Sequence, residues 1–229
     1  MAKKSKESTP TALSNVEETL SKTEQYLEEN YKVLLTGLGV IVFIVALFWL
    51  SKILLSKRND EAQSQIYQAE KYLELDSLRL ALYGDGNYLG FIDIAKSYRL
   101  TKTGNLANYG AGVCYLHLGD YELAIEHLSK YSKKDKVIGS LAIGAMGDAY
   151  IELGDLEKGV AQYIKAADFA SNSFNSPIFL MKAGEIYELS GKYSDALKVY
   201  ERIENEYASS TEGSSIARYI ARVKFLMSE

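Results

Sequence analysis

Cysteine, histidine and proline are nearly absent from this sequence of 229 residues. One cysteine, Cys114, and two histidines, His117 and His127, exclude a disulfide framework and a cysteine-based metal site within one chain. The two prolines, Pro10 and Pro177, leave most of the chain free of helix breakers. Runs of β-branched residues are confined to one short segment. We therefore predict an all-α fold rather than a β-sandwich or a barrel.

Positive charge is in deficit as well. The net charge is −4, and the part of the chain after Arg58 has 18 Lys and Arg residues against 24 Asp and Glu residues. An acidic domain is poorly suited to nucleic acid, whose binding depends on neutralised phosphates. Catalytic motifs are also missing: there is no phosphate-binding glycine loop, HExxH, cysteine pair or nucleophile elbow. The segment Gly84–Asn87 begins like a calcium loop but lacks the later ligands. We expect no nucleic-acid partner, no enzymatic activity, no metal and no cofactor.

One long apolar run stands out, the 18 uncharged residues VLLTGLGVIVFIVALFWL from Val33 to Leu50. With Lys52 extending its charge towards water, the run continues to Leu55 and spans roughly 27–35 Å as a helix, enough for a bilayer core of about 30 Å. Trp49 lies near one end, where aromatic rings favour the membrane interface. The run is too long and begins too late for a cleavable signal peptide. We predict a membrane anchor, with Val33, Trp49 and Leu50 as its markers.

The residues before this run form an acidic tail. A capping-box pattern from Ser14 to Glu17 predicts that a helix begins there, whereas residues 1–10 are predicted to be disordered. The tail helix either lies at the membrane interface or binds a partner, or it extends the membrane helix into water. The numbers of lysines and arginines near the two ends of the apolar run differ by only one. Charge alone therefore leaves the orientation of the helix in the membrane open.

Three later segments repeat one pattern: GVCYLHLGDYELAIEHLSKY from Gly112, GDAYIELGDLEKGVAQYIKA from Gly147, and GEIYELSGKYSDALKVYERI from Gly184. Their turn glycines are 35 and 37 residues apart, which is typical of a helix–turn–helix repeat of about 34 residues. We expect the first glycine of each copy to allow a second helix to approach closely. The turn glycines Gly119, Gly154 and Gly191 are predicted to end the first helix in a left-handed conformation. The large residues expected in the grooves between turns are Leu128, Tyr163 and Tyr200.

This pattern resembles the tetratricopeptide repeat. The fold predicted from it is all-α, with one transmembrane helix followed by a tetratricopeptide-repeat solenoid. A degenerate hairpin is expected upstream, with helices over Ala62–Leu82 and Tyr88–Tyr98, and a closing helix is expected downstream. The predicted divisions are a partly helical tail over 1–31, the transmembrane helix over 32–55, a linker and degenerate hairpin over 56–104, three repeats over 105–205, and the closing helix over 206–229.

In such arrays the first helix of each repeat lines the inner surface. The residues there mix aromatic, apolar and acidic side chains that suit an extended or helical segment of a partner. For the apolar members, packing within the domain is an equally good explanation. The predicted groove residues are Tyr109, Val113, Leu116, His117, Asp148, Ile151, Glu152, Met181, Glu185 and Glu188.

The layout of a short tail, one membrane helix and a repeat domain resembles the YfgM-like family of ancillary subunits of the SecYEG translocon. Segments such as LRLALYGDGNYLGFIDI and TGNLANYGAGVCYLHLGDY look most like its Bacteroidota branch. The resemblance implies a bacterial inner-membrane protein with a cytoplasmic N-terminus and a periplasmic repeat domain. It also implies a chaperone-like role for exported polypeptides, with SecYEG and a PpiD-type membrane-anchored prolyl isomerase as partners.

Two other functions stay open at this stage. One is a tetratricopeptide scaffold that faces the cytoplasm, and the other is a periplasmic envelope-assembly factor that is not tied to the translocon. All three alternatives share a membrane anchor and a protein-binding array without chemistry of its own.

Overall fold

The computed structural model describes residues 11–228 and divides the chain into two compact units, one ending at Leu54 and one beginning at Leu55. It is 81% helical, and no strand occurs in the described residues. This confirms the predicted all-α class. The predicted disorder of residues 1–10 falls outside the described part of the chain.

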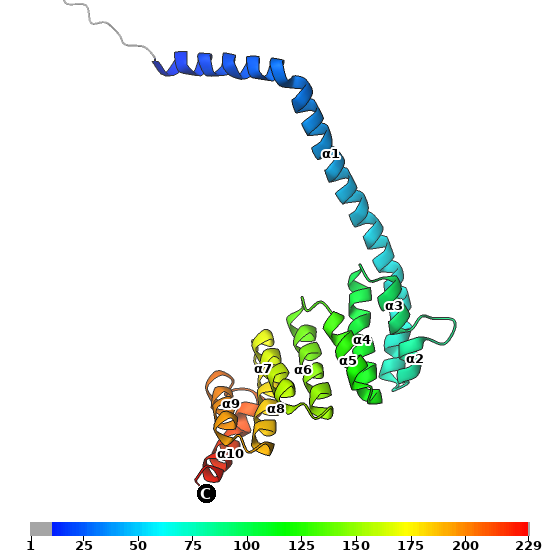
Figure 1. The fold of residues 1–229 in the computed structure, drawn as a ribbon, viewed down its shortest axis with the longest axis vertical. Coiled ribbons are helices and arrows are strands. Elements are labelled where there is room, and N and C mark those ends of the chain that lie inside the picture. Colours follow the sequence, from blue (N-terminus) through cyan, green and yellow to red (C-terminus); the bar gives the residue numbers. More distant parts are fainter. Residues whose placement is uncertain (1–10, 229) are drawn as a thin grey trace, which may run out of the picture. The chain divides into compact units, whose positions relative to one another are not determined.

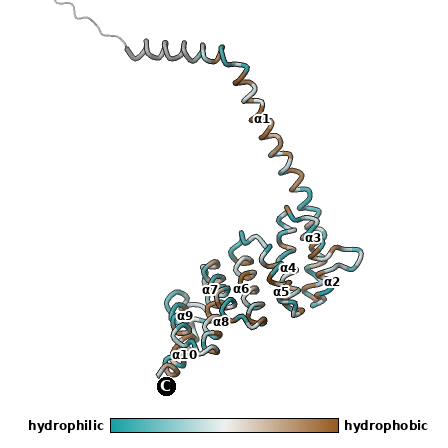
Figure 2. The backbone as a smooth tube through the Cα atoms, viewed as in Figure 1, coloured by the Kyte–Doolittle hydropathy of each residue, from teal (hydrophilic) through white to brown (hydrophobic). Residues whose placement is uncertain are grey.

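Helix α1 (Thr11–Glu74) contains the apolar run (Figures 1 and 2). Of the described helices, it alone is long and apolar enough to cross a membrane. Every side chain from Tyr31 to Arg58 is exposed, although most of them are apolar. At the two ends of the run, Lys32 lies over the Tyr31 ring and Lys52 over the Trp49 ring, at 5.9 and 5.8 Å from the ring centroids. The helix begins at Thr11, three residues before the predicted start, and continues into the apolar run without a break.

Within the described residues, the second unit consists of the end of α1 and nine further helices, most of which pack against the next in the chain (Figure 1). Each hairpin consists of two helices joined by a short turn. The helices are α2 (Leu78–Tyr83), α3 (Phe91–Ser97), α4 (Lys102–Leu118), α5 (Tyr121–Lys130), α6 (Lys136–Glu152), α7 (Leu156–Ala170), α8 (Ser176–Leu189), α9 (Tyr193–Glu206) and α10 (Thr211–Leu226).

Each of the three clear hairpins places a large side chain of its second helix on a glycine of its first. A Cβ added at Gly112 would come within 2.5 Å of Leu128, and one at Gly147 within 2.7 Å of Tyr163. A Cβ added at Gly184 would meet the Tyr200 ring in the same way. The close helix approach expected at these glycines is present, and the structure shows that the large residues lie directly on them. The missing side chain lets the two helix axes approach closely, and the large residue fills the groove that remains.

The turn glycines also have the expected conformation. Gly119 has a φ of 83°, and its N–H donates to the Leu116 carbonyl, while the Asp120 N–H donates to the Tyr115 carbonyl. Gly154 and Gly191 have φ values of 81° and 69°. An L-residue with a Cβ is strained in this region, which explains the glycine in all three turns.

The hairpin before the repeats differs from its prediction. The helix expected over Ala62–Leu82 is interrupted, because α1 ends at Glu74 and Asp76 takes a φ of 56°. The second helix begins at Phe91 rather than Tyr88, and the loop before it is held by side chains. The Asp85 carboxylate accepts hydrogen bonds from the Asn87 and Tyr88 N–H groups and from the Tyr72 hydroxyl, at 2.8–2.9 Å. The acidic residue of the calcium-like run therefore serves to close a loop.

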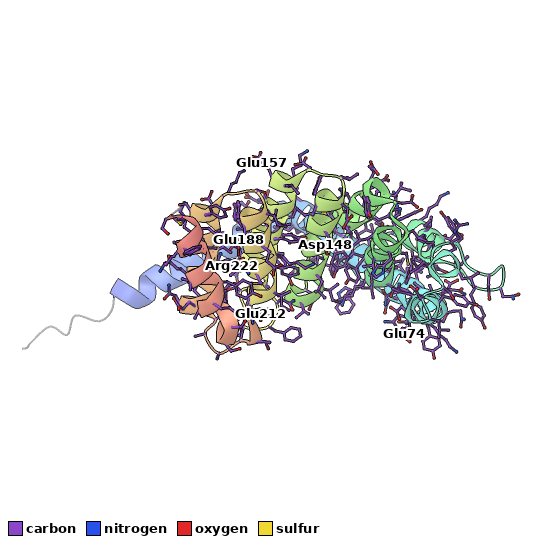
Figure 3. The ribbon with its side chains drawn as sticks, turned by 90° about the horizontal axis from the view of Figure 1, so that it is seen from below. Glu74, Asp148, Glu157, Glu188, Glu212 and Arg222 are labelled. Carbon is purple, nitrogen blue, oxygen red and sulfur yellow. The ribbon has the colours of Figure 1, made fainter. Side chains whose placement is uncertain are left out.

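Helix α10 covers the open end of the array. Its buried face consists of Ile216, Ile220 and Val223, which belong to the same hydrophobic core as α9. The Arg222 guanidinium donates two hydrogen bonds, of 2.7 and 2.9 Å, to the Glu188 carboxylate on α8 (Figure 3). A bidentate pair of this kind fixes the orientation of both side chains. The helix thus supplies the capping surface that a stack of repeats requires at its end.

The start of α6 provides a test of the local structure. The Asp135 carboxylate accepts hydrogen bonds of 2.8 Å from the N–H groups of Val137 and Ile138. We expect Asp135→Ala to lower the free energy of unfolding by about 1 kcal/mol, since two N–H groups at the helix start lose their partner. Asp120→Ala is the matched control, because Asp120 precedes α5 without a side-chain cap bond. Equal urea-unfolding midpoints for the two variants would contradict this account of Asp135.

Candidate partner-binding groove

A cavity of about 280 Å³ lies among the first helices of the three repeats, α4, α6 and α8. Because equivalent helices supply it, its walls continue from one repeat to the next. Most of its lining is apolar, and its charged groups come from α6 and α8. The lining residues are Tyr109, Val113, Leu116, His117, Leu141, Ala145, Asp148, Asn175, Ile178, Phe179 and Lys182.

The α4 side of this groove is aromatic and half-buried. The Tyr109 ring packs on Tyr131 with the two centroids 5.7 Å apart. Burial raises the pKa of the Tyr109 hydroxyl above its ordinary value. Val113 and Leu116 are half-buried, and His117 is exposed at the end of the helix. A wall of this kind offers apolar area at little cost in side-chain entropy, because Tyr has few rotatable bonds.

Phe179 forms part of the groove floor on the α8 side. It is 5% exposed, and its ring lies where a Cβ on Gly144 of α6 would have to be. Gly144 therefore brings α6 and α8 together across the boundary between two repeats, in the same manner as the glycines inside each hairpin. Leu141 and Ile178 lie nearer the surface, 39% and 37% exposed.

One ion pair crosses the groove. Lys182 Nζ lies 2.7 Å from Asp148 Oδ1, and the Tyr163 hydroxyl donates to the same oxygen at 2.6 Å. Burial, with the hydrogen bond to Asp148, raises the pKa of Tyr163 well above its usual range. Lys182 Nζ is also 5.4 Å from the centroid of the Tyr163 ring. Both charged side chains remain a third or more exposed, so the pair contributes only about 0–1 kcal/mol to stability. Its main effect is to hold a carboxylate and an ammonium at defined positions.

The structure brings five of the ten predicted groove residues to this cavity: Tyr109, Val113, Leu116, His117 and Asp148. The other five lie elsewhere. Ile151 packs where a Cβ on Gly159 would be, and Met181 is half-buried against the core.

The three remaining acidic residues, Glu152, Glu185 and Glu188, lie outside the lining of this cavity. The Glu152 carboxylate accepts a 3.3 Å hydrogen bond from Tyr121, and Glu185 is exposed. Glu188 is 11% exposed on its side chain and is held by Arg222 and by the Tyr200 hydroxyl, the latter at 2.6 Å. Its charge is therefore balanced within the domain by α10.

Six lining residues were missed from sequence. Four of them lie on two helix-face rows: Leu141 and Ala145 in the row of Asp148 on α6, and Ile178 and Lys182 on α8. Members of each row are three or four residues apart, the spacing that puts side chains on one helix face. Extending the rows from Asp148 and Glu185 towards the helix starts would have found them.

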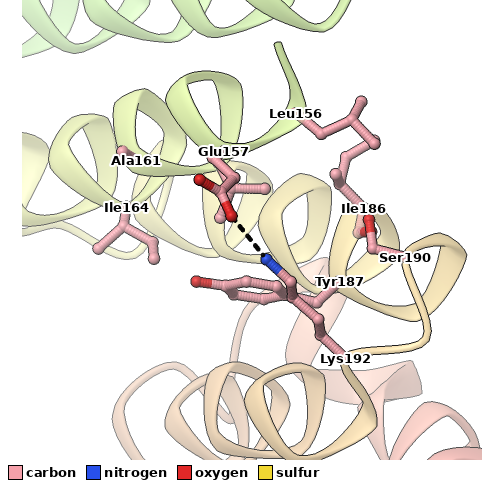
Figure 4. Close-up of a pocket in the computed structure, with 9 residues that line it drawn as sticks. Leu156, Glu157, Ala161, Ile164, Ile186, Tyr187, Ser190 and Lys192 are labelled. Atoms are coloured by element: carbon pink, nitrogen blue, oxygen red, sulfur yellow. Dashed lines mark hydrogen bonds and ion pairs between the residues drawn. The ribbon is translucent and has the colours of Figure 1, made fainter. Parts of the chain in front are cut away.

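A second cavity, of about 410 Å³, lies between α7 and the end of α8 (Figure 4). Its walls are apolar, from Leu156, Val160 and Ile186 among others, and the Glu157–Lys192 ion pair of 3.1 Å lies across it.

The described side chains include no group of three His, Cys, Asp or Glu residues that could hold a metal ion.

Comparison with known proteins agrees with the repeating geometry. Residues 96–136 and 145–211 match the tetratricopeptide repeat family. The chain contains tetratricopeptide repeats. The matched segments cover α4 and α5, the second half of α6, and α7 to α9, which belong to the three hairpins with a large side chain over a glycine. No curated protein matches the chain closely enough to be named as a relative.

Tetratricopeptide repeats are typically protein-interaction domains without enzymatic activity. The groove of α4, α6 and α8 is consistent with that use. It combines apolar walls with one fixed ion pair, and such a surface binds and orients a ligand.

Proposed function

We propose that this chain is a membrane-anchored scaffold that binds another protein in the groove of its tetratricopeptide repeats. Residues 32–55, with Val33, Trp49 and Leu50, form the anchor, and residues 105–205 form the binding array. One observation carries the proposal: equivalent helices of three successive repeats line a single apolar cavity that contains a defined ion pair.

The groove defines the chemistry of its ligand. The Asp148–Lys182 pair offers an acceptor and a donor 2.7 Å apart, between the aromatic wall of α4 and the floor at Phe179. A partner segment with two or three apolar side chains and one polar side chain matches this arrangement. Helical and extended segments both bind in grooves of this kind, through apolar anchors at regular spacing.

The resemblance to the YfgM-like family supports a more specific proposal. In it, the chain is an accessory subunit of the SecYEG translocon in the bacterial inner membrane. Its N-terminus is cytoplasmic, its repeats are periplasmic, and it assists exported polypeptides together with a PpiD-type prolyl isomerase. The alternatives are a scaffold that faces the cytoplasm and an envelope-assembly factor that acts apart from the translocon.

The groove is tested by placing two carboxylates on its apolar walls, one on α6 and one on α8. We expect the double variant Leu141→Glu/Ile178→Glu to lose at least about tenfold in partner recovery, because docking would bury two added carboxylates where the nearby cation, Lys182, is already paired with Asp148. Both positions are more than a third exposed, so the fold should tolerate the change. The measurement is copurification in mild detergent with quantitative mass spectrometry of translocon subunits and the prolyl isomerase.

The matched control is Leu123→Glu, since Leu123 is 41% exposed on α5 and lies outside the groove. Equal recovery by the wild type, the control and the double variant would rule out the groove. Recovery of envelope proteins without translocon subunits would favour the assembly factor. Protease access to the C-terminal repeats in intact spheroplasts separates the periplasmic arrangement from the cytoplasmic one.

A further inference from the structure

The residues that directly follow the apolar run are attached to one loop of the repeat unit. Arg58 Nη2 donates a 3.0 Å hydrogen bond to the Ser97 carbonyl, and its guanidinium lies 5.7 Å from the centroid of the Tyr98 ring. One residue later, Asn59 Oδ1 accepts hydrogen bonds of 3.1 Å from both the backbone and the hydroxyl of Thr103. The α3–α4 loop is therefore fixed beside the start of this unit.

The α5–α6 loop lies next to the α3–α4 loop. Asn105, in the first turn of α4, bonds to the α5–α6 loop: its Oδ1 accepts a 2.7 Å hydrogen bond from the Ser132 N–H, and its Nδ2 donates to the Ser132 carbonyl at 3.3 Å. The two loops enclose a shallow cavity of about 660 Å³. Its lining residues are Arg99, Leu100, Thr101, Lys102, Asn105, Leu106, Tyr131, Ser132, Lys134 and Asp135.

These two loops are basic in an otherwise acidic domain. Residues 99–102 and 130–136 hold six of the 18 Lys and Arg residues after Arg58, and one acidic residue, Asp135. The Asp135 carboxylate already accepts hydrogen bonds from two N–H groups at the start of α6. On the facing part of α1, Asp60 and Glu61 are exposed acidic neighbours. The two loops nevertheless carry a clear excess of positive charge.

Three of the six cations line this cavity and are free to meet a ligand, and a fourth, Lys136, is exposed on α6 outside the lining. Lys130 pairs with Glu126, and Lys133 donates to two backbone carbonyls. Arg99, Lys102 and Lys134 are exposed, and none of the ion pairs among the described side chains includes them. Between Arg99 and Lys102 lies Leu100, whose side chain is 72% exposed. Cations around one exposed apolar side chain are the usual composition of a surface that contacts lipid headgroups.

We propose that the α3–α4 and α5–α6 loops bind the anionic headgroup layer of the membrane in which α1 is anchored. Leu55, the last residue of the apolar run, is three residues from Arg58, or about 4.5 Å of helix. The loop held by Arg58 therefore lies within about one Debye length, roughly 8–10 Å, of the membrane surface, where attraction between cations and anionic lipid is strong. Arg99, Lys102 and Lys134 contact phosphate groups, and Leu100 enters the interface.

This proposal depends on the proposed anchor, so its test measures the two separately. The full chain is reconstituted in vesicles of phosphatidylcholine, with or without 30% phosphatidylglycerol. Flotation with the vesicles after alkaline extraction reports on the anchor. An environment-sensitive fluorophore on Ser132→Cys, quenched by a nitroxide on the lipid headgroups, reports on the loops. Both leaflets have the same composition, so the result is independent of orientation.

The control label is placed on Ser194→Cys, which is exposed at the start of α9, at the opposite end of the hairpins from Ser132. The native thiol does not interfere, because Cys114 is fully buried and burial raises its pKa to about 12. We expect at least a twofold increase in quenching at residue 132 when phosphatidylglycerol is present, reversed by 0.5 M salt, and no change at residue 194.

The variant Arg99→Gln/Lys102→Gln/Lys134→Gln is expected to lose this increase while still floating with the vesicles. The charge-matched control Lys158→Gln/Lys192→Gln/Lys198→Gln is expected to keep it. Quenching that is the same with and without phosphatidylglycerol, or the same in the two triple variants, overturns the proposal. In that case the three cations are available to an acidic protein surface. Failure to float, by contrast, refutes the anchor.

Discussion

Replacing Tyr200 with Ala should lower the free energy of unfolding of the repeat unit by about 3–5 kcal/mol, the range for loss of a large buried aromatic side chain. Tyr200 is 0% exposed and lies on Gly184, so no neighbouring Cβ is available to fill the space that its ring leaves. It also packs against Tyr219 of α10, with the ring centroids 5.6 Å apart. Loss of the ring therefore weakens the third hairpin and its cap together.

Two companion variants separate the ring from its hydroxyl. Tyr200→Phe keeps the ring and removes only the hydrogen bond to Glu188, which retains Arg222 as a partner, so about 1 kcal/mol should be lost. Tyr67→Ala removes an equal side chain that is 66% exposed and should change stability by less than about 0.5 kcal/mol. Urea unfolding of the full chain in detergent, followed by circular dichroism, measures all three. A midpoint for Tyr200→Ala equal to that of Tyr67→Ala would refute the packing role.

Gly144→Ala should destabilise the junction between the second and third repeats by about 1–3 kcal/mol, through overpacking against Phe179. The sign of this effect is informative. On helix propensity alone, Gly to Ala within a helix stabilises by about 1 kcal/mol. The Phe179 ring occupies the place of the added Cβ, and its burial leaves it little room to move. Steric repulsion should therefore outweigh propensity.

The control for this prediction is Gly39→Ala, because a Cβ at Gly39 meets nothing within 4 Å. Adding Phe179→Leu to Gly144→Ala should recover part of the lost stability, and the double-mutant cycle should show coupling of about 0.5–3 kcal/mol. Unchanged or increased stability for Gly144→Ala alone would mean that the two helices can separate freely. Since Phe179 also lines the groove, the measurement connects packing between repeats to the shape of the binding surface.

Local patterns were sufficient to predict the hairpins. A left-handed turn requires glycine, and close helix contact requires a small residue opposite a large one. Both conditions act over about twenty residues, so the amino-acid order alone reveals them at Gly112, Gly147 and Gly184. The irregular hairpin upstream was predicted less well. Its shape depends on Asp76 with a positive φ and on the loop bonds of Asp85, which no repeat pattern indicates.

The groove was predicted only in part, because its lining depends on how one hairpin packs on the next. Asp148 and Lys182 are 34 residues apart and meet only when α6 and α8 are adjacent. The sequence predicted Glu188 as a groove residue, but Arg222 of α10 forms an ion pair with it. The arrangement of the groove thus comes from contacts between repeats, whereas the prediction used the spacing within each one.

The amino-acid order was sufficient to predict a helix apolar enough to cross a membrane and a run of helical hairpins joined by glycine turns. Both features depend on residues close together in the chain, through helix length, side-chain polarity and backbone conformation. The packing of the helices in space determines which side chains share the groove, and it brings Arg99, Lys102 and Lys134 to one cavity between two loops. Those arrangements depend on contacts between helices that are distant in sequence, which no local pattern records.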